Sequence, residues 1–569
     1  MFNRFAIWCL PVLAMISLTA NAGTRPTIQW SIAFNTDSTA HSFGAVHYSE
    51  SEPDIVFMAG AGDFYAIGHE FPDPSIYPQT KMLPEGVDLS NAVPGEDDGI
   101  WVAKINYRTN EIVFFTFIVL GKAATHPVVS DMAIDASGDI FLVGHTTVTP
   151  QAVPPFPQVN PVAGCGGSRN GQPSMDGLVA KVSADGQQLK LLCPYGGTRD
   201  DYLTAVDTFP NGLFVVAGYT NSQDAPTSVG YPTQLNGSQD GFFAVHLGEQ
   251  TNHALYRAAY FGGSGEDAIL DVLVVGTNTL YLGGISNSID IATTTDAIGI
   301  SPRGELDQIL VRIDPETGEP VYTSYLGGSG NEDIQAMAAD PQGNLYLVGT
   351  SNSLDYPTVG QNAIAPISST GAVVTKLDRN LRNVIFSSYH ATATANFTSG
   401  EAIAVNSYGD IAIGGQHEDP MFYPAINPLT NLDDGAANTD RENAHVIKWL
   451  NVNGAYALDY ATHLGSQGRV LGLDLDDREN LLIGGEVVLN PYIDTKYHFE
   501  PFPGFPNASM GPFAMVITND VPTTGNPPTG GGGGGGGGGA VGLWLLVGLA
   551  LLLIGGHGRP QWLLRIASL

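Results

Sequence analysis

Two cysteines carry the most definite chemistry in this sequence. The chain has three cysteines, and Cys9 lies in the first 22 residues, which are expected to be removed from the mature protein. Such N-terminal segments lead to oxidising compartments, where paired thiols form disulfide bonds. The even pair that remains, Cys165 and Cys193, therefore predicts one disulfide bond.

The N-terminal segment has the features of a secretory signal peptide. Arg4 supplies a positive charge, residues 5–18 are almost wholly apolar, and Ala-Asn-Ala at 20–22 is a small-residue cleavage site. Residues 1–22 are therefore predicted to be a signal peptide, and the protein is predicted to be exported.

Two acidic segments carry oxygen ligands of the kind that Ca²⁺ prefers. The first contains Asp433, Asp434, Asp440 and Glu442, and the second contains Asp474, Asp476, Asp477 and Glu479. Neither has the ligand spacing of an EF-hand, and the second falls in a predicted turn, where aspartate is common. No cysteine or histidine group has the spacing of a zinc site. No cofactor or metal is therefore expected, with Ca²⁺ kept as the alternative.

Motifs of the common catalytic classes are missing from the sequence. It contains neither Gly-x-Ser-x-Gly nor His-Glu-x-x-His. The Gly-Gly-Ser-Gly runs at 262–265 and 327–330 lack the helix and lysine that follow a phosphate-binding loop, so we interpret them as turns. We expect a binding or adhesion module rather than an enzyme. An extracytoplasmic lyase or glycan hydrolase is the alternative.

Acidic residues far outnumber basic ones in this chain. The sequence has 56 Asp and Glu against 23 Lys and Arg, a formal net charge of −33 at pH 7. Such a charge repels the phosphate backbone of nucleic acids and anionic membrane surfaces. No nucleic-acid partner is therefore expected.

A repeated unit of four strand-like runs organises most of the chain. Each run is short and rich in β-branched or aromatic residues, and no helical periodicity separates the runs. A glycine at the end of the third run marks each unit, and it recurs at Gly60, Gly144, Gly218, Gly284, Gly349, Gly415 and Gly485. Four-stranded units at this period predict an all-β fold, a seven-bladed β-propeller of four-stranded antiparallel blades.

The order of the strands within a blade is predicted from two repeated features. The run that ends in Gly-Gly is taken as the first and innermost strand, and its repeated tyrosine indicates packing: Tyr195, Tyr260, Tyr325, Tyr389 and Tyr460. The fourth run has a basic residue at its penultimate position in six units: Lys104, Lys181, His246, Arg312, Lys376 and Lys448. Because charge on an exposed edge blocks edge-to-edge pairing, the fourth run is predicted to be outermost. A ring of cationic ligands is the alternative.

The first run of the first unit, residues 28–34, has no complete unit before it. We expect it to close the ring by pairing beside the C-terminal blade, which removes an exposed sheet edge. Residues 23–518 are thereby assigned to the propeller.

One stretch of the repeat resembles a known family. Residues 325–357, which contain Tyr-Leu-Gly-Gly-Ser-Gly and end in Ser-Asn-Ser-Leu-Asp-Tyr-Pro, look like the SBBP repeat of bacterial exported β-propellers. The similarity extends more weakly over Thr27–Thr518, and Tyr389-His390-Ala391 stands where Tyr-Leu-Gly-Gly is expected. The resemblance implies the fold and an extracytoplasmic setting. It implies no reaction and no catalytic residues.

The C-terminal tail has the layout of a sorting signal. Residues 519–539 form a Pro/Thr/Gly linker that ends in ten glycines, residues 540–556 are apolar and helix-like, and residues 557–569 are basic. This layout resembles the GlyGly-CTERM signals of Gram-negative bacteria, which implies a sorting protease as a partner and a destination at the cell surface. Retention of 540–556 as a transmembrane anchor is the alternative.

The candidate binding face is predicted from loop lengths. Length varies in the segments between the third and fourth runs, such as 61–97, 416–442 and 486–510, and insertions on one face of a repeat protein often mark its functional surface. These segments hold the aromatic residues Phe64, Tyr65, Phe422, Tyr423, Tyr497, Phe499 and Phe502. Aromatic rings beside carboxylates can contact a protein or a glycan ligand. Packing of the long loops against one another is the alternative.

Overall fold

The computed structural model describes the greater part of the region assigned to the propeller. The described residues are 27–33, 42–49, 51–63, 80–84, 98–109, 111–121, 124–149, 156–165, 173–228, 234–248, 253–360, 363–364, 370–390, 397–418, 443–466, 468–488 and 510–518. The chain divides into two units, Met1–Asp520 and Val521–Leu569. The predicted signal peptide and the whole of the second unit, including residues 540–556, lie outside the described residues.

Seven β-sheets make up the described part of the first unit, as the repeats predicted, and it contains no α-helix. From the inside outward, blade 1 consists of β2 (Ser42–Tyr48), β3 (Ile55–Asp63), β5 (Asp98–Asn106) and β6 (Glu111–Val119), and blade 2 consists of β7 (Ala124–Ile134), β8 (Ile140–Val148), β9 (Ser174–Val182) and β10 (Leu189–Tyr195). In the same order, blade 3 consists of β11 (Asp201–Thr208), β12 (Phe214–Thr220), β13 (Asp240–His246) and β14 (Leu255–Phe261). Blade 4 consists of β15 (Asp267–Val275), β16 (Thr279–Ser286), β17 (Asp307–Ile313) and β18 (Pro320–Leu326).

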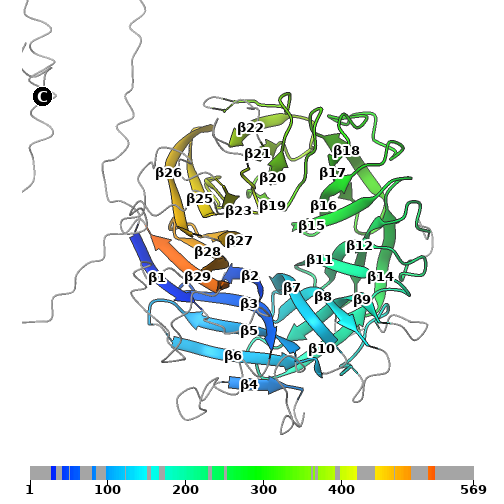
Figure 1. The fold of residues 1–569 in the computed structure, drawn as a ribbon, viewed down its shortest axis with the longest axis vertical. Coiled ribbons are helices and arrows are strands. Elements are labelled where there is room, and N and C mark those ends of the chain that lie inside the picture. The colour runs from blue at the N-terminus through cyan, green and yellow to red at the C-terminus, as the bar shows by residue number, and fades with distance from the viewer. Residues whose placement is uncertain are drawn as a thin grey trace, which may run out of the picture. The chain divides into compact units, whose positions relative to one another are not determined.

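The remaining sheets continue the ring. They are blade 5, β19 (Ala336–Ala339), β20 (Leu345–Ser351), β21 (Gly371–Leu377), β22 (Val384–His390); blade 6, β23 (Ala402–Val405), β24 (Ile411–His417), β25 (Asn443–Val452), β26 (Ala455–Ser466); and blade 7, β27 (Gly468–Leu475), β28 (Leu481–Val488), β29 (Met510–Thr518), β1 (Thr27–Ala33). Figure 1 shows the blades around a centre lined by β2, β7, β11, β15, β19, β23 and β27.

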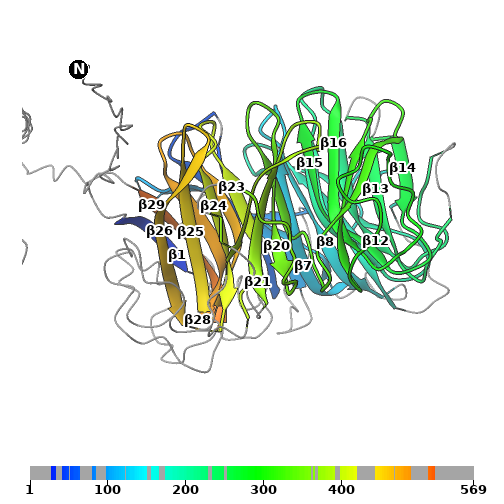
Figure 2. The same ribbon diagram turned by 90° about the horizontal axis from the view of Figure 1, so that it is seen from above.

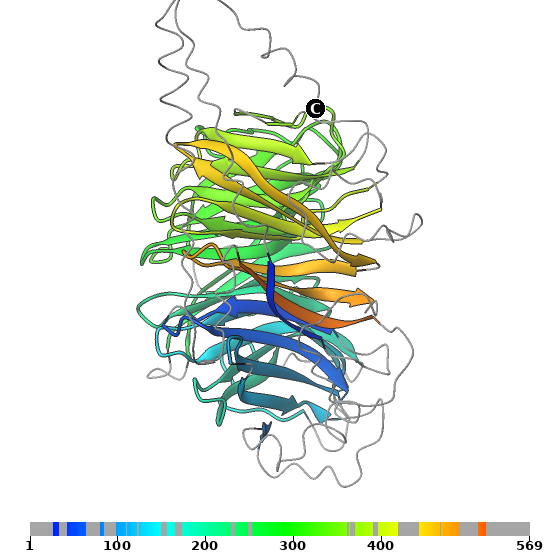
Figure 3. The ribbon, with the colours of Figure 1, turned by 90° about the vertical axis from the view of Figure 1, so that its left-hand side faces the viewer.

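The N-terminal strand closes the ring, as predicted. β1 pairs antiparallel with β29, from Thr27 opposite Thr518 to Ala33 opposite Phe513. Figure 3 shows the blue β1 beside the orange β29. Blade 7 is therefore built from both ends of the propeller region, and its outer edge depends on β1.

The predicted order of strands within a blade is wrong by one strand. The run that ends in Gly-Gly is the outermost strand of each blade, as in β14 and β18, and not the innermost. The predicted fourth run, such as β13 and β17, is the third strand and lies between two neighbours. Hydrogen bonds across each sheet set this order, as in β15-β16-β17-β18, where the run that follows the Gly-Gly is innermost.

Blade 1 departs from four strands. β4 (Thr80–Leu83) adds a fifth strand, which pairs in parallel with the outer strand β6. It comes from segment 61–97, which is predicted from the sequence to be a loop. The outer edge of this blade is therefore covered by the chain's own backbone.

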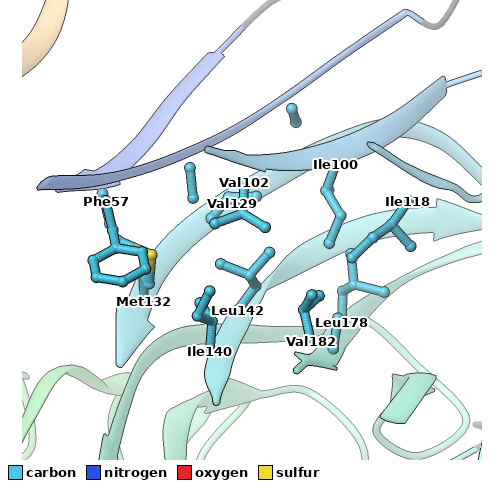
Figure 4. Close-up of a cluster of buried hydrophobic side chains, with 14 of the residues drawn as sticks. Phe57, Ile100, Val102, Ile118, Val129, Met132, Ile140, Leu142, Leu178 and Val182 are labelled. Carbon is cyan, nitrogen blue, oxygen red and sulfur yellow. The ribbon is translucent and has the colours of Figure 1, made fainter. Parts of the chain in front are cut away.

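Neighbouring blades pack through apolar side chains. Figure 4 shows the interface of blades 1 and 2, where Val102 and Ile118 meet Val129, Leu142 and Leu178. Such layers repeat around the ring, each between facing sheets. The apolar area buried between blades is the main source of stability that the fold offers.

The marker glycine lies near a bulge of the innermost strand in blades 1, 2, 3, 4 and 7. In blade 4 the register shifts between Ile269 and Asp271, and the carbonyl oxygen of Ala268 then presses against Gly284. A Cβ atom at Gly284 would overlap that oxygen, so only glycine fits. The same overlap with a carbonyl oxygen applies to Gly144, Gly218, Gly349, Gly415 and Gly485.

The strands run between two faces of the propeller (Figure 2). We call one the turn face, where short turns join the first and second strands of each blade. Asp340 forms such a turn by accepting hydrogen bonds from the backbone amides of Gln342 and Asn344, and Gly343 takes a φ of 79°. We call the other the loop face, where segments join the second strand to the third and each blade to the next.

The predicted disulfide bond is confirmed. Cys165 and Cys193 are bonded, with their Cα atoms 5.5 Å apart and a sequence separation of 28. Cys165 lies in the segment between β8 and β9, the second and third strands of blade 2. Cys193 is on β10, the outer strand of the same blade. The bond therefore ties the segment between β8 and β9 to the edge of blade 2.

Replacing Cys165 and Cys193 by serine is expected to destabilise the protein. Opening a closed loop of 28 residues restores entropy to the unfolded chain, a loss of about 3–4 kcal/mol in the free energy of unfolding. Urea unfolding of the double variant against wild type measures the loss. Two reactive thiols in the unreduced, denatured wild-type protein would contradict the bond itself.

Candidate functional site

The predicted binding-face aromatics fall in segments that the structure does not describe. Phe64, Tyr65, Phe422, Tyr423, Tyr497, Phe499 and Phe502 all lie outside the described residues. The first acidic segment, Asp433 to Glu442, also lies outside them. The remaining candidates for a functional site are therefore described residues on the turn face, on the loop face and along the axis.

The second acidic segment is occupied by structural hydrogen bonds. Asp476 accepts the backbone amides of Arg478 and Asn480 within its turn, and Asp477 accepts the amide of Ser407 in the neighbouring blade. Asp474 accepts the amide of Tyr48. Across the described residues, no group of three or more His, Cys, Asp or Glu is gathered in a way that could hold a metal ion.

The repeated basic residues do not lie on an outer edge, which corrects the prediction. They are on the third strands, and Lys181, His246, Lys376 and Lys448 are buried. Lys376 Nζ lies 3.3 Å from a carboxylate oxygen of Asp340, and Lys448 Nζ lies 3.4 Å from one of Asp459. A cation can be buried here because each blade places an acidic or polar partner within reach.

Buried carboxylates link consecutive blades on the loop face. Gly263 donates its amide to Asp267 Oδ2 at 2.8 Å, and Ser288 donates its hydroxyl to the same oxygen at 2.7 Å. Asp201 Oδ2 accepts the amide of Gly197 and the hydroxyl of Ser222 in the same way. Glu332 accepts the amide of Gly328 on Oε2 and the hydroxyl of Ser353 on Oε1. We call Asp201, Asp267 and Glu332 the inter-blade carboxylates. Burial raises the pKa of Asp201 to about 6 and also raises the pKa of Glu332.

The Gly-Gly-Ser-Gly runs owe their repetition to these contacts. Each run leaves the outer strand of one blade and presents its amides to an inter-blade carboxylate of the next. A further carboxylate, Asp290 or Asp355, accepts the backbone amide and the hydroxyl of Ser264 or Ser329. These runs therefore hold carboxylates of the protein itself, in agreement with their interpretation as turns.

The repeated tyrosines serve packing, although on outer strands rather than inner ones. All five are at most 2% exposed. Tyr260, Tyr325 and Tyr389 donate their hydroxyls to the carbonyl oxygens of Ser222, Ser288 and Ser351, at 2.6–2.8 Å. The hydroxyls thereby anchor the segments that follow the second strands.

Four aspartates on the innermost strands link neighbouring blades near the axis. Each accepts a backbone amide from the innermost strand of the next blade: Asp131 from Val206, Asp207 from Val274, Asp271 from Met337 and Asp474 from Tyr48, at 2.5–2.9 Å. We call them the axial carboxylates. His47 Nδ1 lies 3.2 Å from Asp474 Oδ2. Sequence reasoning missed this set because the aspartates occupy two different positions along the innermost strands.

The axial groups titrate in an unusual range. Burial raises the pKa of Asp131 to about 6 and that of Asp207 to about 7. Burial and the charge of Asp131 raise the pKa of Asp271 well above its usual range. Burial opposes protonation of His47, but the hydrogen bond and charge of Asp474 outweigh it and raise the pKa of His47 to about 9.

Between pH 5 and pH 9 the propeller is expected to lose stability as the pH rises. The pKa of Asp207 is about 7 in the folded protein and about 4 in the unfolded chain. Its stabilising contribution is therefore complete below pH 4 and is lost as the pH rises through 7. His47 has the same sign, since its contribution is complete below about pH 6.5 and is lost as the pH rises through 9.

Thermal unfolding across this pH range measures the effect. The melting temperature should fall from pH 5 to pH 9 and fall less in Asp207→Asn. The matched control is Asp185→Asn, since Ser183 holds the pKa of Asp185 below its usual value and this exposed carboxylate titrates below the range. A melting temperature that rises with pH in wild type would contradict the assignment.

Exposed apolar side chains occur in the segments that follow the second strands of blades 4 and 5. Seven large hydrophobic residues of the described part are exposed, and four of them follow the second strands of these blades: Ile289, Ile300, Leu354 and Val359. Ile289 and Leu354 are 82% and 65% exposed and occupy the same position of the repeat, Ser-Asn-Ser-(Ile or Leu)-Asp. Arg303, near Ile300, is ion-paired with Asp355, next to Leu354, at 2.9 Å.

Solved structures of other proteins are similar to this chain at low identity. The WD40 repeats of RRP9 match at 9% identity over 87% of this chain and 99% of that chain, with a TM-score of 0.43. The acylaminoacyl peptidase of Pyrococcus horikoshii matches at 9% identity over 79% of this chain and 50% of that chain, with a TM-score of 0.37. The quinohemoprotein alcohol dehydrogenase of Comamonas testosteroni matches at 8% identity over 89% and 79%, with a TM-score of 0.36. Likeness at this level carries no inference about activity.

The sequence comparisons concern one repeat. No curated protein matches this chain significantly. Residues 321–357 match the family described as beta-propeller repeat, SBBP. The matched segment runs from the outer strand of blade 4, β18, into the two inner strands of blade 5, so it crosses the junction between these blades. The chain thus carries an SBBP beta-propeller repeat at residues 321–357, within a propeller of seven blades.

Proposed function

We propose that this protein is a non-enzymatic binding or adhesion module that is exported to the cell surface. Its ligand is a protein or a glycan, and its binding surface is the loop face. The net charge of −33 disfavours a nucleic-acid ligand. The observation that carries the proposal is the exposure of Ile289 and Leu354 at the same repeat position after the second strands of blades 4 and 5.

The titratable groups support binding over catalysis. The inter-blade and axial carboxylates are engaged by backbone amides and hydroxyls, so their hydrogen bonds serve the fold. A general base or nucleophile needs instead to face a substrate. We therefore place the function on the surface rather than in the axis.

The proposed location follows from both ends of the sequence. Residues 1–22 direct export, and residues 519–569 supply a linker, an apolar segment and a basic end. In this proposal a sorting protease removes the segment after the glycine run. Retention of 540–556 as a membrane anchor is the alternative, and the mass of the protein recovered from the cell surface separates the two. Among the described residues, no helix has the length and apolar character needed to cross a bilayer.

Replacing Ile289 and Leu354 together by serine is expected to abolish ligand binding at an unchanged melting temperature. Both side chains are mostly exposed, so their removal costs the fold little, whereas central apolar contacts dominate binding energies. Binding of the full chain to glycan and protein arrays, and adhesion of cells that display it, should fall by at least about tenfold.

The matched control is the pair Val321→Ser and Ile385→Ser, which are exposed on outer strands away from the loop face. Equal losses in both pairs would contradict a binding surface on blades 4 and 5. The variant Tyr497→Ala, Phe499→Ala, Phe502→Ala tests the predicted aromatics in the same assays. A lower melting temperature with unchanged adhesion would mean that these aromatics only pack the loops.

A further inference from the structure

Three aromatic rings lie together where blades 2 and 3 meet, at the loop-face ends of their strands. His145 is near the end of β8, Tyr202 is the second residue of β11, and Tyr219 is the last residue but one of β12. Figure 1 shows β8 and β11 in neighbouring blades. We call these three residues the aromatic cluster. All three side chains are partly exposed, so the cluster reaches solvent.

The rings of the aromatic cluster are in contact with one another. The rings of Tyr202 and Tyr219 are stacked, with their centroids 4.7 Å apart and an angle of 20° between their planes. The ring of His145 meets that of Tyr202 at 64°, with the centroids 5.0 Å apart. The two blades therefore present one continuous aromatic surface at this junction.

The repeat itself does not require aromatic rings at these positions. His145 and Tyr219 each follow the marker glycine of their unit. The residues at this position in the other units are Ala61, Ile285, Thr350, Gln416 and Glu486. Tyr202 is the strand partner of Tyr219, whereas Ala268 is the strand partner at this position in blade 4. The fold forms without aromatic rings here, and residues that depart from a local rule in this way are candidates for function.

Hydrogen-bonding groups accompany the rings. Asp200 directly precedes Tyr202 and is exposed, and its Oδ1 accepts the backbone amide of Met175 at 3.0 Å, which holds the carboxylate at this junction. Burial, and then the charge of Asp200, raise the pKa of Tyr202, so its hydroxyl keeps its proton. Burial lowers the pKa of His145, so its ring is neutral at pH 7. The junction therefore offers aromatic surface beside hydroxyl groups, a neutral imidazole and a carboxylate.

This combination of groups suits a sugar ring. A pyranose has a face of C–H groups, which packs against aromatic rings, and an edge of hydroxyls, which exchange hydrogen bonds with phenol and carboxylate oxygens. Aromatic surface with a few convergent polar groups is also the usual composition of a small-molecule site. An aliphatic protein surface would instead take the carboxylate of Asp200 out of water without a hydrogen-bond partner.

We propose that the aromatic cluster, together with Asp200, is a binding site for a neutral sugar ring. This inference rests on the proposed function, and it assigns the glycan ligand of that function to the loop-face end of the junction between blades 2 and 3. The tyrosine rings contact the C–H face of the sugar, and the hydroxyl of Tyr202 and the carboxylate of Asp200 bind its hydroxyls. The net charge of −33 favours neutral sugars over acidic ones.

The direct test uses the full chain without substitutions. Cellohexaose, chitohexaose and a neutral mannan oligosaccharide are each titrated into the protein, with calorimetry and the near-UV circular dichroism of tyrosine as readouts. We expect saturable binding of at least one of them with a change in the tyrosine band, because the rings contact the sugar. An oligosaccharide of galacturonic acid should bind more weakly, since its charge is repelled. No binding of any of the three neutral sugars would overturn the proposal.

Variants then locate the site. Tyr202→Leu removes a ring and should weaken binding of the neutral sugar by at least about tenfold, whereas Tyr202→Phe keeps the ring and should weaken it by less than about threefold. Asp200→Asn should also weaken binding. The matched control is Tyr408→Leu, because Tyr408 is 63% exposed in a turn of blade 6 on the opposite face. It should leave the affinity unchanged, and melting temperatures show that each variant keeps the fold.

The outcomes separate this proposal from the proposed function. Unchanged sugar affinity in Tyr202→Leu, or equal losses in Tyr202→Leu and Tyr408→Leu, would overturn the site and leave the proposed function in place. A wild-type protein that binds a protein ligand and no sugar would do the same. A wild-type protein that binds neither class of ligand would overturn both.

Discussion

Deleting residues 27–33 is expected to abolish the cooperative unfolding of the propeller. Without β1, the third strand of blade 7, β29, keeps β28 on one side but loses its outer antiparallel partner along residues 513–518. β29 carries Phe513, Met515 and Ile517, which are almost fully buried in the interfaces of blade 7. An uncovered β29 also presents an unpaired sheet edge, which favours aggregation.

The deletion is made after residue 26, so that the predicted signal peptide and cleavage site are kept. A matched control removes residues 530–536, seven of the ten glycines in the linker. Urea unfolding followed by circular dichroism should show a sharp transition for the control and none for the β1 deletion. A β1 deletion that unfolds at the wild-type midpoint would contradict ring closure by this strand.

Replacing Lys181 by methionine is expected to cost about 3–5 kcal/mol in the free energy of unfolding, the range for breaking a buried ion pair. Lys181 Nζ lies 2.9 Å from Asp135 Oδ2 and 3.1 Å from Asp139 Oδ2, and all three side chains are nearly buried. Burial opposes ionisation of Asp139, but Lys190 and Lys181 together hold its pKa below the usual value. Removing Lys181 therefore leaves buried negative charge with too little compensation.

Arg312→Met is the matched control, since Arg312 occupies the same position on the third strand of blade 4. Its guanidinium makes a long contact of 3.5 Å to the carbonyl oxygen of Arg379 and has exposed surroundings, so its loss should cost less than about 1 kcal/mol. Denaturant unfolding of both variants gives the comparison. Equal losses in the free energy of unfolding for the two variants would contradict a stabilising role of the buried ion pairs of Lys181 with Asp135 and Asp139.

The number of blades could be predicted from the sequence because each blade repeats the same local requirements. The marker glycine leaves room for a carbonyl oxygen of the innermost strand, and the turn aspartate or asparagine accepts hydrogen bonds from the amides of its own turn. Both requirements are local, so they recur visibly in the sequence. The disulfide between Cys165 and Cys193 was predictable for a simpler reason, since the two were the only thiols left to pair.

The period of the repeat does not show where one blade ends and the next begins. A ring of identical units looks the same wherever the unit is cut, so the Gly-Gly run could be assigned to either end of a blade. The hydrogen-bonded order of each sheet, such as β15-β16-β17-β18, settles the assignment. Residues 28–34 were expected to close the ring by joining the C-terminal blade. A strand that comes from the other end of the chain adds to the open edge of that blade, so this run has to be an outermost strand.

The same error led to the wrong account of the basic residues. An outermost strand would expose Lys181 and Lys448, whereas the third strand buries them beside carboxylates of their blade or its neighbour. The axial carboxylates could not be predicted either. They come together only through contacts between strands and blades, which leave no fixed spacing in the sequence.

Hydrogen exchange of the backbone amides in β1 tests ring closure most directly, because it reports on the pairing of β1 with β29 in the intact protein. The ladder predicts that the alternate amides of residues 28–33 that donate to β29 are protected, and that they exchange together with the amides of residues 513–518 that donate to β1. Exchange of residues 28–33 at the rate of an unstructured peptide, with residues 513–518 still protected, would contradict a propeller closed by its N-terminal strand.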